Sequence, residues 1–202
     1  INSLLGAGQM MFTKYIVVVD GNIDIRAYSD LINEILTNTD FKKDLVFIRG
    51  PLDVLDHSSD TFAFGGKLGI DATHKTTVEK EGSDSDQEII NVIEDINLDY
   101  LIALNLIKNY NRPTGVKNRA LLILSVDTLA MSEPMTKLRD VLNGIPGTGQ
   151  FKVILAVDHT VDVNDYFTVA WQVLGNTDPV RDHCYVSGST LFIDATVKAF
   201  RT

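Results

Sequence analysis

The stretch Lys14-Tyr15-Ile16-Val17-Val18-Val19-Asp20 decides the fold, because it occurs twice in the chain. It returns 138 positions later as Lys152-Val153-Ile154-Leu155-Ala156-Val157-Asp158. Each copy is a continuous run of β-branched and aliphatic residues between a lysine and an aspartate. Such runs are typical of strands that are buried on both faces of a sheet. The sequence therefore predicts two equivalent core strands.

The similarity continues beyond the two strands in one register, as expected of an internal repeat. After Gly50 the spacing falls from 138 to 123 residues, so the second copy lacks part of one connection. We interpret the two copies as a duplicated unit. The matching pairs are Ile23-Asp24-Ile25 with Val161-Asp162-Val163, Tyr28 with Tyr166, Asn38-Thr39-Asp40 with Asn176-Thr177-Asp178, Asp44 with Asp182, Gly50 with Gly188, and Ile70-Asp71-Ala72-Thr73 with Ile193-Asp194-Ala195-Thr196.

Each copy is predicted to form a strand, a helix and a second strand. Apolar residues recur at helical spacing after each first strand, and Asp40 and Asp178-Pro179 are expected to end the helices. Further strands are predicted at Leu45–Ile48 and Cys184–Val186. The apolar stripes are Leu31, Ile32, Ile35 and Leu36 in the first copy and Val169, Ala170, Val173 and Leu174 in the second.

The fold class predicted from this order is α/β, a layered sheet, mainly parallel or mixed, flanked by helices. We assign residues 1–80 to the first unit and residues 146–202 to the second, shortened unit. Residues 81–145 connect them. In the connection, Ser85 opens a helical stretch that runs to about Asn109, and a buried strand at Ala120–Val126 precedes a helix that begins near Pro134. Whether the two units share one sheet is open at this point.

Charge and composition exclude several classes of partner. The 202 residues carry a formal net charge of -9, and the basic residues are scattered, so neither nucleic acid nor an anionic membrane surface is an expected partner. The sequence contains no apolar run long enough to span a membrane. The single cysteine, Cys184, excludes an internal disulfide and fits the reducing cytoplasm, and we expect it to be buried and inert. Because the chain starts at Ile1 without a methionine, we expect a piece of a longer protein.

Residues Phe12–Lys75 resemble the C-terminal portion of the UbiD carboxy-lyase family. The resemblance rests on Thr13-Lys14 before the first strand, on Asn22-Ile23-Asp24-Ile25, and on Pro51-Leu52-Asp53. Its most specific part is Gly66-Lys67-Leu68-Gly69-Ile70-Asp71-Ala72-Thr73. This sequence departs from the family pattern at Phe41, where a proline is usual, although Pro179 keeps it in the second unit.

The resemblance implies that the parent chain is a decarboxylase of aromatic, quinone-precursor acids. It implies prenylated FMN as the cofactor, with one divalent and one monovalent cation, all bound by domains that precede this one. The resemblance therefore places no catalytic residue, cofactor or metal in this chain. It implies the flavin-binding domain of the same chain as a partner, and a homo-oligomer. A stand-alone nucleotide or small-ligand binding module is the alternative.

Four aspartates stand where open α/β sheets bind ligands, at the carboxyl ends of strands. Asp20 and Asp24 follow the first strand, and Asp158 and Asp162 follow its copy. A cation or phosphate site is one interpretation. The other is turn and helix-cap chemistry, which needs aspartate at such places, and we favour it because each unit has a complete capping explanation. A receiver-like signalling domain would also end a strand in aspartate, but the duplicated unit has no place in it.

The remaining candidates lie in residues 51–75, which we predict to be a long loop. Phe62 and Phe64 could cover a pocket of the flavin domain, or they could pack on the protein's own core. For Lys67, Asp71 and His74 we expect an ion pair or an interface contact rather than catalysis. The four histidines show no metal-ligand spacing, so no metal site is predicted.

Overall fold

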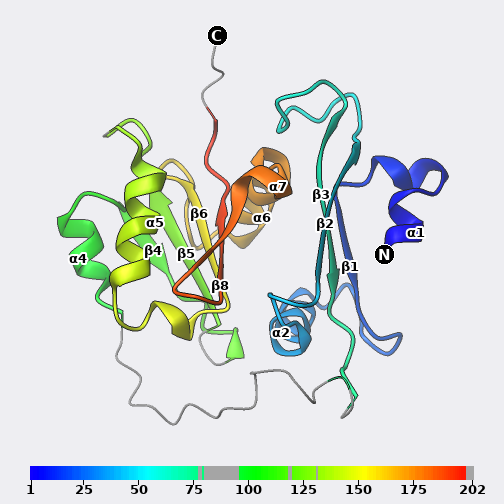
Figure 1. Cartoon of the computed structure of the whole chain (residues 1–202). Coiled ribbons are helices and arrows are strands. Elements are labelled where there is room, and N and C mark those ends of the chain that lie inside the picture. The colour runs from blue at the N-terminus through cyan, green and yellow to red at the C-terminus, as the bar shows by residue number, and fades with distance from the viewer. Residues whose placement is uncertain (77–78, 80–95, 118–119, 131, 199–202) are drawn as a thin grey trace.

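The computed structural model describes residues 1–76, 79, 96–117, 120–130 and 132–198. They form two separate β-sheets, drawn at the right and the left of Figure 1. The fold is therefore mixed α/β with sheets flanked by helices, as predicted. The two copies of the core strand lie in different sheets, which answers the question that the sequence left open.

Sheet 1 has three strands in the order β1-β3-β2, with β1 (Tyr15–Val18) parallel to β3 (Phe64–Asp71) and β2 (Leu45–Pro51) antiparallel to it. The prediction of a loop over residues 51–75 was wrong in its second half, because β3 is the central strand of this sheet. Its glycines are needed for close packing. A Cβ on Gly66 would lie 2.1 Å from Asp178 Oδ1, and a Cβ on Gly69 would lie 2.2 Å from a side-chain carbon of Ile1.

The N-terminal segment covers one face of sheet 1. It consists of α1 (Asn2–Leu5) and the 3₁₀ helix η1 (Gly8–Phe12). Lys67 of β3 points to this side, where its Nζ donates hydrogen bonds to the carbonyls of Met11 and Thr13. The side chain is fully buried, so these two carbonyls are what satisfies its ammonium group.

Sheet 2 has five strands in the order β4-β5-β6-β8-β7, with β4 and β7 antiparallel to their neighbours and the other pairs parallel. Strands β4 and β5 come from the connecting residues, so that segment shares a sheet with the second unit. The strands are β4 (Asn109–Asn111), β5 (Leu121–Val126), β6 (Val153–Asp158), β7 (His183–Val186) and β8 (Thr190–Asp194).

Helices cover both faces of sheet 2. On one face α4 (Leu98–Ala103) and α5 (Pro134–Gly144) pack on β5, β6 and β8 in the largest apolar cluster. On the other face lie α6 (Tyr166–Asn176) and also α2 (Tyr28–Asn38), a helix of the first unit. The first unit therefore contributes its helix to the core of the second. Short elements complete the chain, namely the 3₁₀ helix η4 (Thr148–Gln150) and α7 (Pro179–Asp182).

Strands β6, β8 and β7 pair in the same order and directions as β1, β3 and β2. The pair Tyr15–Leu68 corresponds in the sequence repeat to Val153–Leu191. The connections differ, because residues 52–63 join β2 to β3 whereas a three-residue turn joins β7 to β8. In that turn Ser187 and Gly188 have φ values of 47° and 83°. Duplication of the unit is the hypothesis that this pairing supports.

Residues 85–95 of the helical stretch predicted from Ser85 to Asn109 lie outside the described residues. In the described remainder the helix ends at Ala103 and Asn109 begins β4, so the prediction of a helix to about Asn109 was wrong. The described part contains α4, which begins after Asn97, whose side chain accepts a hydrogen bond from Tyr100 N. None of the helices within the described ranges is long and apolar enough to cross a membrane.

Candidate functional site

The carboxyl end of sheet 1 brings Asp71, Lys75 and Asp44 together. Asp71 Oδ1 accepts hydrogen bonds from Thr73 N (3.0 Å) and Thr73 Oγ1 (2.6 Å). Lys75 Nζ lies 3.2 Å from Asp71 Oδ1 and 3.6 Å from Asp44 Oδ2. Partial burial raises the pKa of Asp71, but the bonds from Thr73 and the ammonium of Lys75 outweigh it and hold that pKa below its ordinary value. This carboxylate is held by its own chain.

The same arrangement recurs at the end of sheet 2. Asp194 Oδ1 accepts from Thr196 N and Thr196 Oγ1. Lys198 Nζ lies 3.1 Å from Asp194 Oδ1 and 3.8 Å from Asp182 Oδ1. Two equivalent ion-pair clusters thus close the ends of the two sheets, and neither leaves a carboxylate without a partner.

The four strand-end aspartates bond to backbone groups. Asp20 Oδ2 accepts from His74 N, and Asp158 Oδ2 accepts from Val197 N, both at 2.8 Å. Burial raises the pKa of Asp158. Asp24 and Asp162 each accept from the backbone N–H two residues further on, at 2.9 Å.

The prediction that Asp24 and Asp162 cap the helices was wrong. A turn follows each aspartate before the helix begins, so α2 has Ala27 at its N-cap and α6 has Asp165. Asp165 is the true cap, and its side chain accepts from Thr168 N. Among the described residues there is no group of three or more His, Cys, Asp or Glu that could hold a metal ion.

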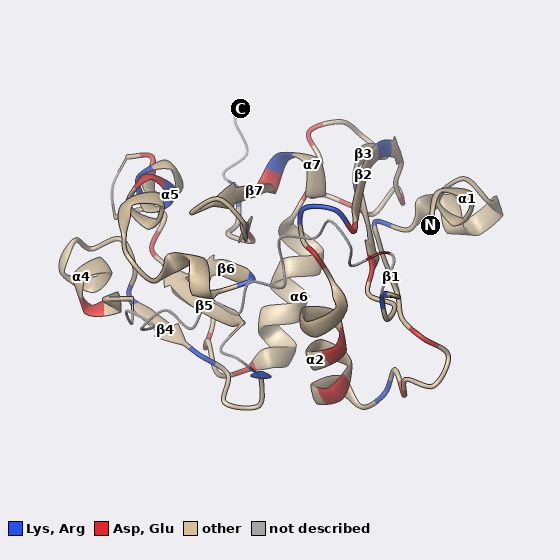
Figure 2. Ribbon diagram, turned by 60° about the horizontal axis from the view of Figure 1, so that its bottom comes forward, with Lys and Arg blue, Asp and Glu red and all other residues tan. Residues whose placement is uncertain are grey.

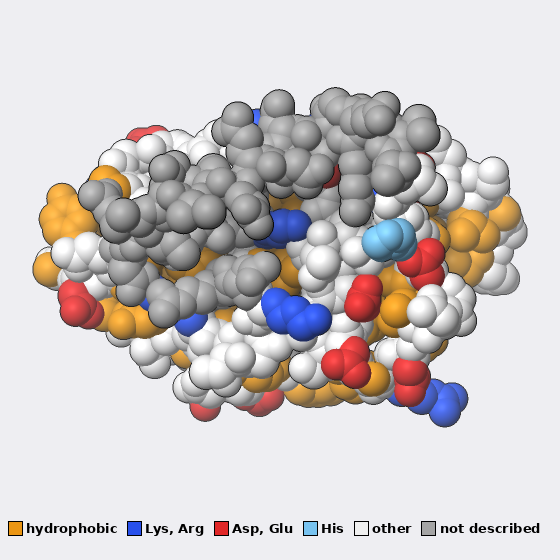
Figure 3. Space-filling model, turned by 90° about the horizontal axis from the view of Figure 1, so that it is seen from below, with side chains coloured by type: hydrophobic (Ala, Val, Ile, Leu, Met, Phe, Trp, Pro, Cys, Tyr) orange, Lys and Arg blue, Asp and Glu red, His pale blue; other side chains and the backbone are white. Residues whose placement is uncertain are grey.

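The residues predicted in the 51–75 segment do not form one cluster. Phe62 is 81% exposed beside the start of β3, and Phe64 is also exposed. Asp71 and His74 lie at the opposite end of that strand, about 23 Å away at 3.3 Å per residue. Lys67 lies between them, buried against the N-terminal segment. Figure 3 shows acidic side chains gathered on the sheet 1 side of the lower face, around a histidine.

The contact between the two sheets was not predicted from the sequence. Asp178, the N-cap of α7, accepts from Val180 N (2.9 Å) and Arg181 N (3.2 Å), and its second oxygen accepts from Gly66 N of β3 (2.8 Å). Arg181 reaches back to Asp60, with 2.7 Å between Nη1 and Oδ1. The Thr-Asp pair repeated at 39–40 and 177–178 was a signal for such a cap.

His183 lies at the centre of this contact, between aromatic rings of sheet 1. Its ring centroid lies 6.1 Å from that of Tyr15 and 5.9 Å from that of Phe47. Neither ring nitrogen has a hydrogen-bond partner among the residues that the structure describes. Burial lowers the pKa of His183 to about 4, so the imidazole is neutral at pH 7 and a weak base.

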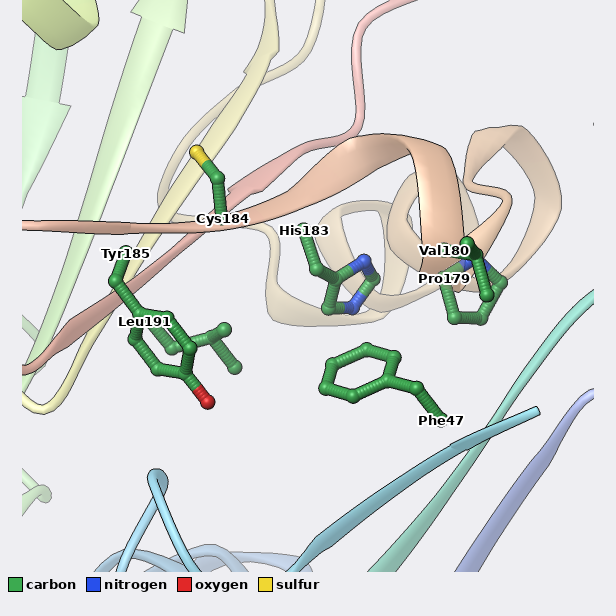
Figure 4. Close-up of a pocket in the computed structure, with 7 residues that line it drawn as sticks. All are labelled: Phe47, Pro179, Val180, His183, Cys184, Tyr185 and Leu191. Atoms are coloured by element: carbon green, nitrogen blue, oxygen red, sulfur yellow. The ribbon is translucent and has the colours of Figure 1, made fainter.

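A cavity of about 210 Å³ opens beside this histidine, as Figure 4 shows. His183 faces Phe47 across it, whereas Cys184 points to the other side of β7, where its Sγ lies 3.8 Å from Arg139 Nη1. The thiol and the imidazole therefore cannot act together. The cavity walls are mostly apolar and are formed by Phe47, Pro179, Val180, His183, Cys184, Tyr185 and Leu191.

A family model matches residues 1–72 and 87–199, and its description is the 3-octaprenyl-4-hydroxybenzoate carboxy-lyase C-terminal domain. Uncharacterized proteins of Helicobacter pylori strains J99 and 26695 are each 27% identical in an alignment of 205 positions that covers 96% of this chain. The chain spans 30% of the length of these curated relatives.

Two solved structures are similar over part of the chain. An evolved dimeric form of the UbiD-class enzyme HmfF from Pelotomaculum thermopropionicum, in complex with prFMN, has a TM-score of 0.42 at 21% identity. That match covers 50% of this chain and 24% of the other. The vanillic acid decarboxylase of Sedimentibacter hydroxybenzoicus has a TM-score of 0.42 at 12% identity, over 76% of this chain and 38% of the other.

Proposed function

Because the chain belongs to the 3-octaprenyl-4-hydroxybenzoate carboxy-lyase family, as its C-terminal domain, we propose that it is the non-catalytic scaffold of a decarboxylase. The parent enzyme acts on aromatic carboxylic acids of the quinone-precursor type in the cytoplasm. The family match over residues 1–72 and 87–199 is the observation that carries this proposal. Within it, residues 1–80 and 146–202 are the two copies of one unit and residues 81–145 connect them.

The chemistry of the described side chains supports a scaffold. The carboxylates at the sheet ends bond to lysines, threonines and backbone N–H groups of the same chain, which suits a structural role. His183 is a weak base inside the contact between the sheets. Prenylated FMN and its two cations belong, in this proposal, to the flavin-binding domain of the parent chain, as the family resemblance implies.

The tip of the long β2–β3 connection is the surface that we propose contacts the flavin domain. Phe62 lies in this connection and Phe64 begins β3 beside it, and both rings are exposed in this chain, where a second domain could cover them. Replacing both by serine in the parent enzyme is expected to lower decarboxylation. The same change in this chain should leave its stability within about 0.5 kcal/mol, because surface substitutions rarely do more. Leu129→Ser, at a residue 90% exposed in another loop, is the matched control.

Carbon dioxide release tests the main proposal. This chain, incubated with prenylated FMN, a divalent cation, K⁺ and a panel of aromatic acids, is expected to give no turnover. The parent enzyme assayed beside it is expected to release carbon dioxide from at least one acid. Sustained release by this chain alone would contradict the scaffold role, and a parent inactive on every acid would contradict the decarboxylase assignment.

The inter-sheet cavity is the observation that favours the alternative, a small-ligand binding module. A ligand present at 100 times its Kd would stabilise the folded chain by about 2.7 kcal/mol. A thermal-shift screen with nucleotides, flavins and small aromatic acids therefore separates the two functions. We expect no shift from any of these compounds.

A further inference from the structure

The cavity between the two sheets is large enough for one aromatic ring. Its volume is about 210 Å³, and its walls are mostly apolar. Phe47 of β2 forms the side that belongs to sheet 1, and residues of α7, β7 and β8 form the other side. Engineered apolar cavities of about 150 Å³ stay dry and bind benzene. Size and lining therefore suit a small aromatic molecule.

The cavity can be reached from solvent. Three of its lining residues, Phe47, Val180 and Tyr185, are 37%, 39% and 41% exposed. Side chains with this exposure change rotamer within nanoseconds. A small molecule can therefore enter without separating the sheets.

His183 is the polar side chain of this cavity that the fold leaves without a partner. A neutral imidazole has one hydrogen-bond donor and one acceptor. Both ring nitrogens are buried, and neither has a partner within the described part of the chain. The hydroxyl of Tyr185 already donates to Phe41 O, and Cys184 points away from the cavity (Figure 4). Because buried polar groups are nearly always bonded in native proteins, the bare imidazole points to a ligand or a water.

The charges around the cavity select an uncharged molecule. Among the described residues, those that line the cavity include no lysine or arginine. The nearby cations Arg181 and Lys198 both pair with Asp182. Figure 2 shows basic and acidic positions side by side on α7. A carboxylate entering the cavity would lose its water without gaining a cation, which is strongly unfavourable.

We propose that this cavity binds a small uncharged aromatic alcohol, a phenol, whose ring lies among the apolar walls and whose hydroxyl bonds to the imidazole of His183. A phenol hydroxyl can donate or accept, so it pairs with either ring nitrogen. The ring of Phe47, which faces His183 across the cavity in Figure 4, turns aside to admit it. A benzoic acid of the same size is excluded by its charge.

This selectivity has a consequence for the parent enzyme, which rests on the function proposed above. Loss of carbon dioxide from an aromatic hydroxy acid leaves a phenol, because a proton takes the place of the carboxylate. The cavity would therefore accept the product of such a reaction and reject its substrate. Binding by this chain, in contrast, does not depend on the reaction.

Fluorine NMR of this chain with 4-fluorophenol, fluorobenzene and 4-fluorobenzoate tests the proposal. We expect 4-fluorophenol to bind at least fivefold more tightly than fluorobenzene and at least tenfold more tightly than 4-fluorobenzoate. A fivefold difference corresponds to about 1 kcal/mol, the net value of one hydrogen bond between neutral groups. No binding of 4-fluorophenol up to about 10 mM, or equal binding of the benzoate, overturns the proposal.

Two variants locate the binding. Val180→Phe fills the cavity from its exposed side and should weaken 4-fluorophenol binding at least tenfold. Val54→Phe makes the same change at a residue 61% exposed in the β2–β3 connection and should have no effect. His183→Leu should abolish the preference for 4-fluorophenol over fluorobenzene.

The proposal is overturned if Val180→Phe binds like the natural chain, or if the preference persists in His183→Leu. Circular dichroism of each variant establishes that the fold is retained, and the three compounds test the natural chain independently of any variant. Because binding is measured on this chain and the scaffold role by carbon dioxide release, either proposal can fail without the other.

Discussion

Acidification should weaken the contact between the sheets through His183. In the folded chain burial lowers the pKa of this imidazole to about 4, while in the unfolded chain it returns to its ordinary value of about 6.5. Below pH 6.5 His183 therefore binds a proton in the unfolded chain, whereas in the folded chain it stays neutral until the pH approaches 4. Because the unfolded state binds more protons, stability falls as the pH falls, over the window from about 6.5 to about 4.

The size of the effect follows from the two pKa values. The full difference corresponds to about 3 kcal/mol, and about 2 kcal/mol of it should be lost by pH 5. Urea unfolding followed by circular dichroism at pH 7.5 and pH 5 measures this loss. Carboxylates also titrate in this range, so the pH-dependent loss of stability in the natural chain is compared with the loss in His183→Leu. Leucine is chosen because Leu45 occupies the equivalent position in sheet 1.

His183→Leu should lose about 2 kcal/mol less than the natural chain between the two pH values, whatever its effect on packing at either one. His57→Gln changes an exposed histidine and should lose as much as the natural chain. If the natural chain and His183→Leu lose the same stability on acidification, the imidazole is not neutral in the folded contact, and the reasoning from its burial is refuted.

Three other substitutions, the first with a matched control, test the packing around sheet 1. Gly66→Ala should lower the free energy of unfolding in urea by more than about 2 kcal/mol, because its Cβ would displace Asp178. The control is Gly21→Ala, whose Cβ meets nothing within 4 Å, and it should change that free energy by at most a few tenths of a kcal/mol. Asp178→Ala should cost about 2–3 kcal/mol by the same measurement, since it removes a helix cap and leaves a buried N–H without an acceptor. Lys67→Met keeps the apolar stem but removes the donor to Thr13 O, so hydrogen exchange in residues 8–13 should become faster, and unchanged exchange there would contradict the role given to this lysine.

The core of each unit could be predicted because its signals are local. The runs at residues 14–20 and 152–158 became β1 and β6, and the apolar periodicity located α2 and α6. A buried strand and an amphipathic helix depend mainly on their own side chains. The fold class followed from the order of these elements.

The third strand of the first unit, β3, could not be predicted from propensity, since Gly65, Gly66 and Gly69 disfavour a strand in isolation. These glycines are tolerated because Asp178 and Ile1 approach β3 too closely for any side chain. The information was nevertheless present in the repeat. The residues before Ile193 are Thr190-Leu191-Phe192, an apolar strand, and the equivalence of Ile193 to Ile70 predicts a strand there too.

The contact around His183 and the cap at Asp178 depend on how two sheets meet. Capping at Asp24 was predicted because the residue type is right, but the turn before the helix moved the cap to Ala27. Spacing in the sequence defines which residues are candidates. Tertiary contacts decide what each candidate side chain bonds to, and here most of the candidate carboxylates accept hydrogen bonds from backbone N–H groups or side chains of the same chain.

The hydrogen bond from Gly66 to Asp178 makes each half of the molecule dependent on the other. At Gly65 and Gly66 the carboxylate of Asp178, which comes from the other half of the chain, occupies the space that a side chain would fill. Asp40, the equivalent of Asp178, accepts a bond from Lys42 N, which corresponds to the bond from Val180 N to Asp178. Because the bond from Gly66 crosses between the sheets, a chain without residues 146–202 would have no Asp178 to accept the hydrogen bond of Gly66 N.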